Sequence, residues 1–346
     1  MGMKRHHIIS NFLLLTTIAI LGSCRPIEEY DNDNTGNFEA LWAMIDQHYC
    51  FLDEKGLDWE EIHDRYGKVV NNSMTRKELF ILLSTMLDEL KDGHVNLSTP
   101  FETSYYRKWW SDYPQNFDER IIEQYYFNFN YKSIGGVMYG NFIQNIGYIR
   151  YPSFSYSLGG GNLDYILNSM NMTAGLIIDI RDNGGGDLVN ADNLVARFIT
   201  DKTLAGYISH KTGPGHNDFS EPEPFYVEPP GNGNILWGKP VVVLTNRSTF
   251  SAANYFTMIM KSLPNVTIIG ATTGGGCGMP ISYELPNGWG VRFSACPVYD
   301  AAGNLTEFGV APSPGCEVDM DPIDAFNGHD TILDFAIEYL ISKASK

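Results

Sequence analysis

The chain has 346 residues, 43% of them hydrophobic, and carries 41 acidic against 24 basic side chains, for a formal net charge of −17 at pH 7. This acidic balance argues against nucleic acid as a partner, because binding to phosphates requires clustered positive charge. The length suits one small and one larger domain, and neither internal repeats nor low-complexity blocks are visible in the sequence.

The first residues have the pattern of a bacterial export signal. Lys4 and Arg5 precede the apolar run FLLLTTIAILG, which is too short to span a bilayer, and LGSC follows, ending at Cys24. This ending resembles the lipobox of bacterial lipoproteins, which implies a signal peptide over residues 1–23 and a lipid on Cys24. The alternative is an ordinary signal peptide cut nearby. We therefore expect a cell-envelope protein held to a membrane by lipid, periplasmic or surface-exposed.

Residues 24–35 are polar and acidic without periodicity, which predicts a flexible tether. Residues 36–98 form a predicted small helical domain. Its first helix begins near Phe38 with apolar residues on one face, and its second begins at Thr75 with the spacing of a capping box. The aromatic-rich residues 99–146 predict strands or a packed connecting loop.

From residue 147 to 346 the pattern predicts an α/β domain. Short apolar strands in GYIRY, AGLIIDI, PVVVL and VTIIG alternate with helices over 188–199 and after Ser251, which favours a largely parallel sheet. ISYELPNGWGVRFSA then predicts a hairpin around Pro-Asn-Gly. A final helix is expected from Thr331 to Ser342.

Four cysteines follow Cys24, and an oxidising compartment permits disulfides among them. The pair to test first is Cys277 with Cys296, because each flanks a strand of the predicted hairpin. The remaining two are Cys50 and Cys316. No cluster of cysteine, histidine and carboxylate has metal-ligand spacing, so we expect no metal and no cofactor.

The stretch STFSAANYF places Ser251 at the start of a predicted helix, directly after a buried strand. The simplest interpretation is that Ser248, Thr249 or Ser251 caps this helix. A nucleophile on a strand-turn-helix is the functional alternative. Taken alone, the stretch favours the cap.

Three other motifs change that balance. Gly184 to Gly186 lie between a strand and a helix, where a turn can present backbone N–H groups to an anion, although a need for positive φ explains one of the three glycines easily. His94 follows a helix in LKDGHVNL, and Glu307 lies in a turn in GNLTEFGVAP. Each is weak individually.

Together and in this order, the motifs resemble the tail-specific, or C-terminal processing, serine peptidase family (peptidase family S41), in particular its tricorn-like branch. The resemblance covers about residues 37–318 and rests on YIRYPSF, GLIIDIRDNGGG, VVVLTNRSTFSAAN, IIGATTGGG and EFGVAP. It implies a crotonase/ClpP-like α/β core with a small N-terminal helical domain. It also implies a Ser251 nucleophile, a His94 base and a Glu307 acid. Oxyanion-hole donors are implied at Gly184, Gly185 and Ala252.

The chain departs from the family at several positions. The lysine of a Ser-Lys dyad falls at Gly276, which excludes a dyad, and Asn254 stands where dyad enzymes often carry glutamate. Tricorn has a serine where this chain has Gly93, so Glu307 orients His94 directly, through water or not at all. The gap before the α/β domain is too short for a PDZ module.

The expected activity is that of a serine endopeptidase acting on polypeptides through an acyl-enzyme. An ordinary histidine base predicts a rise in kcat/KM at about pH 6 to 7. One alternative is an inactive protein on the same scaffold that binds peptides or apolar ligands, as the related retinoid-binding modules do. Another is an esterase with the same residues. The substrate and the oligomeric state are not indicated by the sequence.

Overall fold

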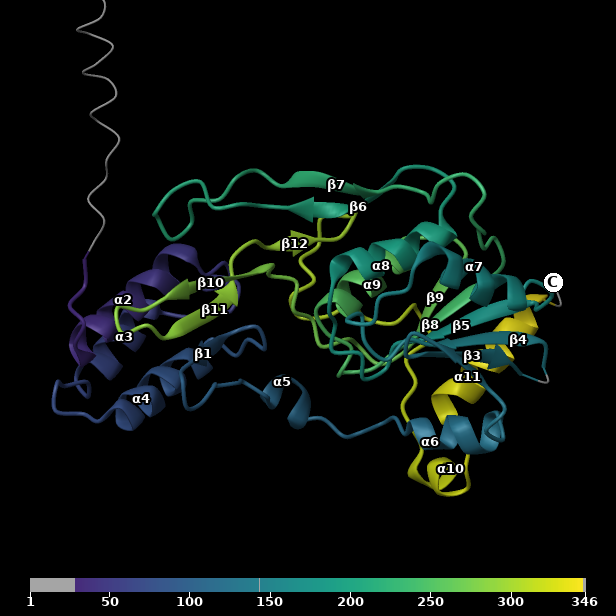
Figure 1. The fold of residues 1–346 in the computed structure, drawn as a ribbon, viewed down its shortest axis with the longest axis horizontal. Helices are drawn as coiled ribbons and strands as arrows, with labels where there is room; N and C mark the ends of the chain where they lie inside the picture. The colour runs from purple at the N-terminus through teal and green to yellow at the C-terminus, as the bar shows by residue number, and fades with distance from the viewer. Residues whose placement is uncertain (1–28, 143, 345–346) are drawn as a thin grey trace, which may run out of the picture.

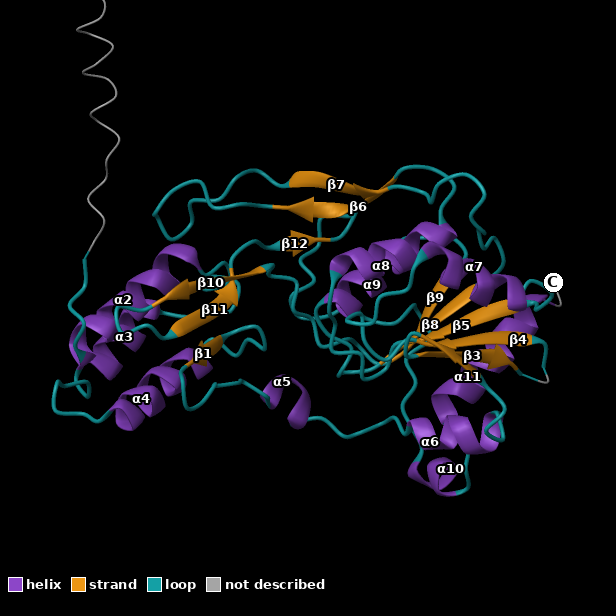
Figure 2. Ribbon diagram, in the orientation of Figure 1, coloured by secondary structure: helices purple, strands orange, loops and turns teal. Residues whose placement is uncertain are grey.

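The computed structural model describes residues 29–142 and 144–344, which form a smaller and a larger unit bridged by a long arm (Figure 1). The predicted signal peptide and Cys24 lie outside the described residues. Within those two ranges, no helix combines the length and apolar character needed to cross a membrane. The predicted α/β class with a small N-terminal helical unit is confirmed, and Figure 2 shows helices beside strands in both units.

The smaller unit packs three helices against a three-stranded antiparallel sheet. The helices are α2 (Asn34–His48), α3 (Trp59–Gly67) and α4 (Arg76–Asp88), and the strands, in sheet order, are β1 (Asn96–Ser98), β11 (Gly290–Ser294) and β10 (Pro280–Glu284). Thr75 and Glu78 form the predicted capping box of α4. α2 begins inside the predicted tether because the side chain of Asp33 caps it by accepting from the Gly36 N–H.

The β10–β11 hairpin belongs to the smaller unit, whereas the sequence placed it with the α/β domain. β11 pairs with β1, and Trp289, Val291 and Phe293 are fully buried in one cluster with Leu41 and Leu83 of the helices. The hairpin itself was predicted correctly from its turn. Which core the hairpin joins depends on contacts with side chains far away in the sequence, and no local sequence pattern reveals those contacts.

The larger unit is built on a six-stranded sheet. Its strands, in order, are β2 (Lys132–Ile134), β3 (Val137–Asn141), β4 (Ile146–Arg150), β5 (Gly175–Asp179), β8 (Val241–Thr245) and β9 (Val266–Gly270). β4, β5, β8 and β9 are parallel, as predicted, and β2 and β3 add an antiparallel edge. The sheet therefore begins within the segment 99–146, for which the sequence indicated either strands or a packed connecting loop.

Helices cover both faces of this sheet. One face carries α7 (Gly160–Ser169), α8 (Leu188–Val195) and α9 (Ala252–Lys261), and the other carries α11 (Thr331–Ala344). Along β5, Leu176 and Ile178 join the cluster of the first face, while Ile177 joins that of the second. Burial on both faces explains why the strands read as uninterrupted apolar runs.

A third sheet forms the arm. It consists of β12 (Val298–Tyr299), β6 (Thr203–Ile208) and β7 (Glu223–Val227), and Figure 1 shows it reaching from the larger unit toward the smaller one. At its tip, His216 Nδ1 lies 2.9 Å from Asp46 Oδ1 and His216 Nε2 lies 3.4 Å from Asp53 Oδ1. The arm thus holds the two units together. The remaining short elements are α5 (Lys108–Ser111), α6 (Glu119–Ile121), the π-helical turn Ile122–Tyr126, the 3₁₀ turn Ala196–Phe198 and α10 (Pro322–Phe326).

Cys277 and Cys296, the pair singled out as the first to test for a disulfide, are both free thiols. Cys277 Sγ lies 2.9 Å from Asn254 Nδ2 in the core of the larger unit. Cys296 Sγ lies 3.6 Å from His210 Nδ1 and packs against the core of the smaller unit. The two thiols belong to different cores, although their sequence positions flank one hairpin.

We expect Trp289→Ala to lower the free energy of unfolding by about 3–5 kcal/mol, because it removes a fully buried indole from the core of the smaller unit. Phe326→Ala is the control, since that ring is 88% exposed, and it should change stability by less than about 0.5 kcal/mol. Urea denaturation measures both. Equal stability of the two variants would show that the hairpin is not part of this core.

Candidate active site

The structure brings Ser251 and His94 together from opposite units. Ser251 lies between β8 and α9 of the larger unit, and His94 lies between α4 and β1 of the smaller one. The Oγ of Ser251 is 2.9 Å from the Nε2 of His94, although 157 residues separate them in the sequence. The site is therefore assembled at the junction of the two units.

The backbone presents the Ser251 hydroxyl to this histidine. Ser251 has φ +57° and ψ −121°, a conformation that costs a residue with a side chain about 1–3 kcal/mol. Its N–H donates to Gly275 O at 2.9 Å, and Thr249 Oγ1 donates to Ile180 O at 3.0 Å, which fixes the turn. The hydroxyl makes no capping hydrogen bond to α9. The capping interpretation is therefore wrong for Ser251.

The ring of His94 is almost completely buried, with 4% of the residue exposed. It packs against Phe250 with ring centroids 4.8 Å apart, and its Nδ1 has no hydrogen-bond partner among the described residues. Burial lowers the pKa of His94 to about 4; the positive charges of Arg292 and Lys55 act in the same direction and Asp92 opposes them. The imidazole is neutral at pH 7 and can accept a proton.

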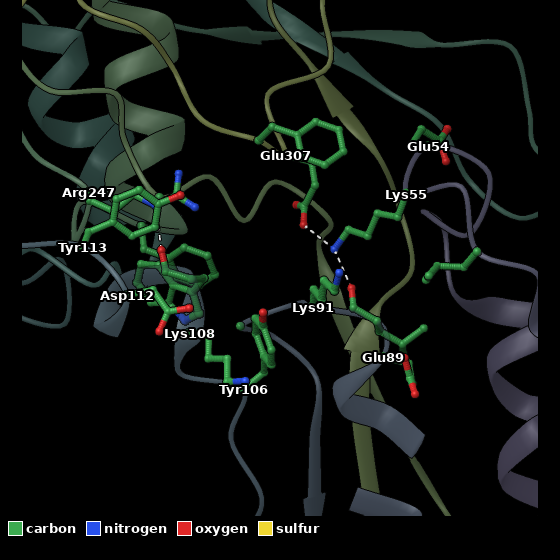
Figure 3. A pocket seen from close by; sticks show the side chains of 17 residues that line it. Glu54, Lys55, Glu89, Lys91, Tyr106, Lys108, Asp112, Tyr113, Arg247 and Glu307 are labelled. Carbon is green, nitrogen blue, oxygen red and sulfur yellow. Dashed lines mark hydrogen bonds and ion pairs between the residues drawn. The ribbon is translucent and has the colours of Figure 1, made fainter. Parts of the chain in front are cut away.

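Glu307 is held away from His94 by other partners. Its Oε1 lies 3.2 Å from Lys55 Nζ, as Figure 3 shows, and its Oε2 accepts from the Cys277 N–H at 3.0 Å. Burial and the Asp92 carboxylate raise the pKa of Glu307 to about 8, against the opposing effect of Lys55 and the backbone donor. No direct hydrogen bond joins Glu307 to His94 within the described ranges.

Two charged residues of this site were missed by the sequence reasoning. Asp92 Oδ1 accepts from the His94 N–H at 2.7 Å, and its Oδ2 accepts from Tyr49 Oη at 3.0 Å and Ser294 Oγ at 2.8 Å. Lys55 Nζ lies 3.8 Å from the same Oδ2. The Asp-Gly-His order contained a usable signal for Asp92. Lys55 carried none, because only the fold brings it to the site.

The glycine-rich turn packs directly against Ser251. A Cβ at Gly185 would lie 2.8 Å from Ser251 Cβ and 2.9 Å from Ala252 N, so only glycine fits there. The Gly185 N–H donates to Asn183 Oδ1 at 2.9 Å. By contrast, no described group accepts from the N–H of Gly184 or of Ala252. Those two donors are the ones left for a bound oxyanion.

Two neighbouring cavities lie at this junction, and only the smaller is lined by the serine and histidine themselves. One, of about 440 Å³, opens onto Ser251, His94 and Gly184. The other, of about 750 Å³, is lined by charges of both signs (Figure 3). Trp109 and Phe250 line both and stack at 4.1 Å, so they form the partition between them. Among residues 29–142 and 144–344, no three histidine, cysteine or carboxylate side chains are placed to hold a metal ion.

The departures at Gly276 and Gly93 have steric reasons. Gly276 has φ +82°, and a Cβ there would lie 2.4 Å from the ring of Phe250, so a dyad lysine does not fit. A Cβ at Gly93 would lie 2.5 Å from Trp109 Nε1. Trp109 thus fills the space next to the position where tricorn has its serine. Asn254 is structural here: its Nδ2 donates to Thr306 O at 3.1 Å.

Comparison with known proteins decides the family. The model of peptidase family S41 matches residues 145–313, and the model of the tricorn protease C1 domain matches residues 30–88. A crystal structure named "putative peptidase" from Parabacteroides merdae is 45% identical, with a TM-score of 0.84, and the match covers 90% of this chain and 97% of that one. The chain belongs to peptidase family S41. This confirms the predicted family, whose class is that of serine-type peptidases.

Other S41 relatives are longer proteins. The chloroplastic C-terminal processing peptidase of Tetradesmus obliquus is 30% identical over 181 residues, which are 52% of this chain and 36% of that protein. The tricorn protease of Thermoplasma acidophilum is 27% identical over 201 residues, 57% of this chain and 17% of that protein. The chain therefore spans well under two thirds of the length of these curated relatives.

We expect Gly185→Ala to slow the reaction of this S41 peptidase with a fluorophosphonate by at least about 10²-fold, because the added methyl pushes the turn away from Ser251 and Ala252. Gly233→Ala, which also has a positive φ but open space around it, is the matched control for backbone strain. Labelling rates followed by mass spectrometry test this. Equal rates in both variants would contradict the close packing.

Proposed function

We propose that this S41 peptidase is a serine endopeptidase that cleaves polypeptides through an acyl-enzyme, with Ser251 as nucleophile and His94 as general base. The observation that carries the proposal is the 2.9 Å contact between Ser251 Oγ and His94 Nε2. A serine hydroxyl is a poor nucleophile until a base takes its proton, and neutral imidazole within hydrogen-bond distance is such a base.

The proposed reaction follows from this geometry. Ser251 Oγ attacks the carbonyl carbon as its proton passes to His94 Nε2, and the protonated histidine then gives that proton to the leaving amine. Water releases the acyl group by the same steps. The N–H groups of Gly184 and Ala252 would hold the oxyanion, each contributing about 3 kcal/mol, and Ala252 adds the positive end of the α9 dipole.

The role of the carboxylate is narrower than the resemblance implied. A Ser-His-Glu triad would need Glu307 near His94 Nδ1, whereas Glu307 binds Lys55 and the Cys277 N–H. We therefore propose a Ser-His pair as the reacting groups. Glu307 then contributes through its ion pair with Lys55, which joins the two units.

The setting of the enzyme is also a proposal. The apolar run ending in LGSC supports a signal peptide and a lipid on Cys24, which would anchor the peptidase in a bacterial cell envelope. The 440 Å³ cavity beside Ser251 supports a peptide segment as substrate. The physical test of the anchor is metabolic labelling with a fatty acid, which Cys24→Ser should abolish.

We expect Ser251→Ala to remove both hydrolysis of an unfolded protein substrate and fluorophosphonate labelling, while Ser248→Ala retains most of both. Ser251 Oγ is the hydroxyl that meets the base, and Ser248 lies three residues earlier in the turn. Circular dichroism confirms that each variant is folded. A label on Ser248 would refute the assignment, and a folded wild type that neither hydrolyses nor labels would support the binding-protein alternative.

We also expect the labelling rate of Ser251 to rise with pH through a value near 4, lower than the value of an ordinary histidine, because burial holds the pKa of His94 at about 4. The base is competent above this pKa, when it is neutral, and incompetent below it. Short labelling pulses between pH 3.5 and 8 measure how the labelling rate rises with pH, and return to pH 7 checks that the protein refolds. A midpoint at pH 6 to 7 would mean that His94 is hydrated in solution.

A further inference from the structure

We propose that Asp92 is the carboxylate that stabilises His94 when it holds the proton of Ser251, acting as a positioning residue in place of Glu307. The inference rests on the proposed function, because it concerns the same serine and histidine. It assigns a role to a residue that neither the motifs nor the family resemblance singled out.

The contacts of Asp92 fix both the carboxylate and the histidine. Asp92 is 2% exposed and precedes His94 by two residues. Its Oδ1 accepts from the His94 N–H, so the carboxylate closes the turn that carries the imidazole. Its Oδ2 accepts from Tyr49 and Ser294. Three donors on one buried carboxylate favour its ionised form.

Asp92 and Glu307 compete for one ammonium group. Lys55 Nζ lies 3.8 Å from Asp92 and 3.2 Å from Glu307, and all three side chains are at most 9% exposed. Burial alone would raise the pKa of Asp92, but Lys55, His94 and the hydrogen bonds outweigh it and hold that pKa below its usual value. The pKa of Glu307 is instead raised to about 8. Asp92 therefore holds its negative charge more firmly than Glu307 does.

Proton transfer to His94 makes this charge necessary. When the O–H bond of Ser251 breaks, its electron pair forms the bond to the carbonyl carbon and its proton binds Nε2, leaving a positive ring in a buried site. The groups whose charges act on that ring are Arg292, whose Nη1 lies 3.4 Å from His94 O, Lys55 and Asp92. Two of these are cations. Asp92 is the one anion among them.

The experiment measures the pKa of His94 with a phosphonyl group on Ser251, which places an oxygen where the oxyanion forms and favours the protonated ring. Protein labelled with ¹⁵N-histidine is treated with a fluorophosphonate and titrated by NMR. We expect Asp92→Asn to lower the pKa of His94 in this adduct by at least about 1 unit and to slow labelling at pH 7 about tenfold. Glu307→Gln should leave the pKa of His94 nearly unchanged.

Matched variants separate charge from structure. The amide oxygen introduced by Asp92→Asn can still accept from the His94 N–H. Ser294→Ala removes a hydrogen bond to Asp92 but keeps the charge of Asp92, so this variant should shift the pKa of His94 far less than Asp92→Asn does. Glu54→Gln removes an exposed charge from the larger cavity and should leave the pKa of His94 unchanged. If Asp92→Asn fails to fold, the double variant Tyr49→Phe/Ser294→Ala provides the second test. It removes two hydrogen bonds from Asp92, which disfavours the charged carboxylate and should lower the pKa of His94.

The outcomes distinguish the two proposals. A pKa for His94 that is the same in Asp92→Asn and wild type, or that falls more in Glu307→Gln, overturns the role of Asp92. If folded wild type takes no label on Ser251, the proposed function fails, and titration of unlabelled protein still decides whether Asp92 raises the pKa of His94. If wild type is labelled on Ser251 but the pKa of His94 is the same in Asp92→Asn, the Asp92 inference fails and the proposed function stands.

Discussion

The hydrogen bond between Ser251 and His94 crosses from one hydrophobic core to another, and the rest of the molecule serves to keep those cores in register. A contact of this kind tolerates displacements of only tenths of an ångström. Aromatic packing of Phe250 on the His94 ring, the ion pair of Lys55 with Glu307 and the arm tip at His216 all span the same junction. Each bridges the two units at a different place.

The charged residues around His94 show how the contacts of a family site can differ in one member. Gly93 leaves room that the indole of Trp109 occupies, and Glu307 is drawn to Lys55. Two buried carboxylates with a single ammonium cannot both ionise easily, so the donors around each decide where the charge resides. Asp92 accepts three hydrogen bonds, which stabilise its charged form, and it lies in the same turn as His94.

Local patterns were sufficient for the features that local physics determines. The capping box at Thr75, the doubly buried strands of the larger sheet and the turn at Ser251 depend on neighbouring residues, and the sequence predicted all three. Features created by folding were not accessible. Lys55 reaches Glu307 across 252 positions, and the β10–β11 hairpin finds its partner in β1. Cys277 and Cys296 were considered together because they flank one hairpin, whereas their side chains pack in separate cores.

The insertion of β10 and β11 into the smaller unit sets the order in which the enzyme can mature during translation. The helices α2 to α4 leave the ribosome early but lack Trp289 and its neighbours, so their core is incomplete until most of the larger unit has been synthesised. Arg292 and Ser294, which contact the His94 turn, arrive with the same hairpin. A nascent chain therefore contains Ser251 before the hairpin that packs around His94 has been made. Proteolytic competence is delayed until synthesis is nearly complete.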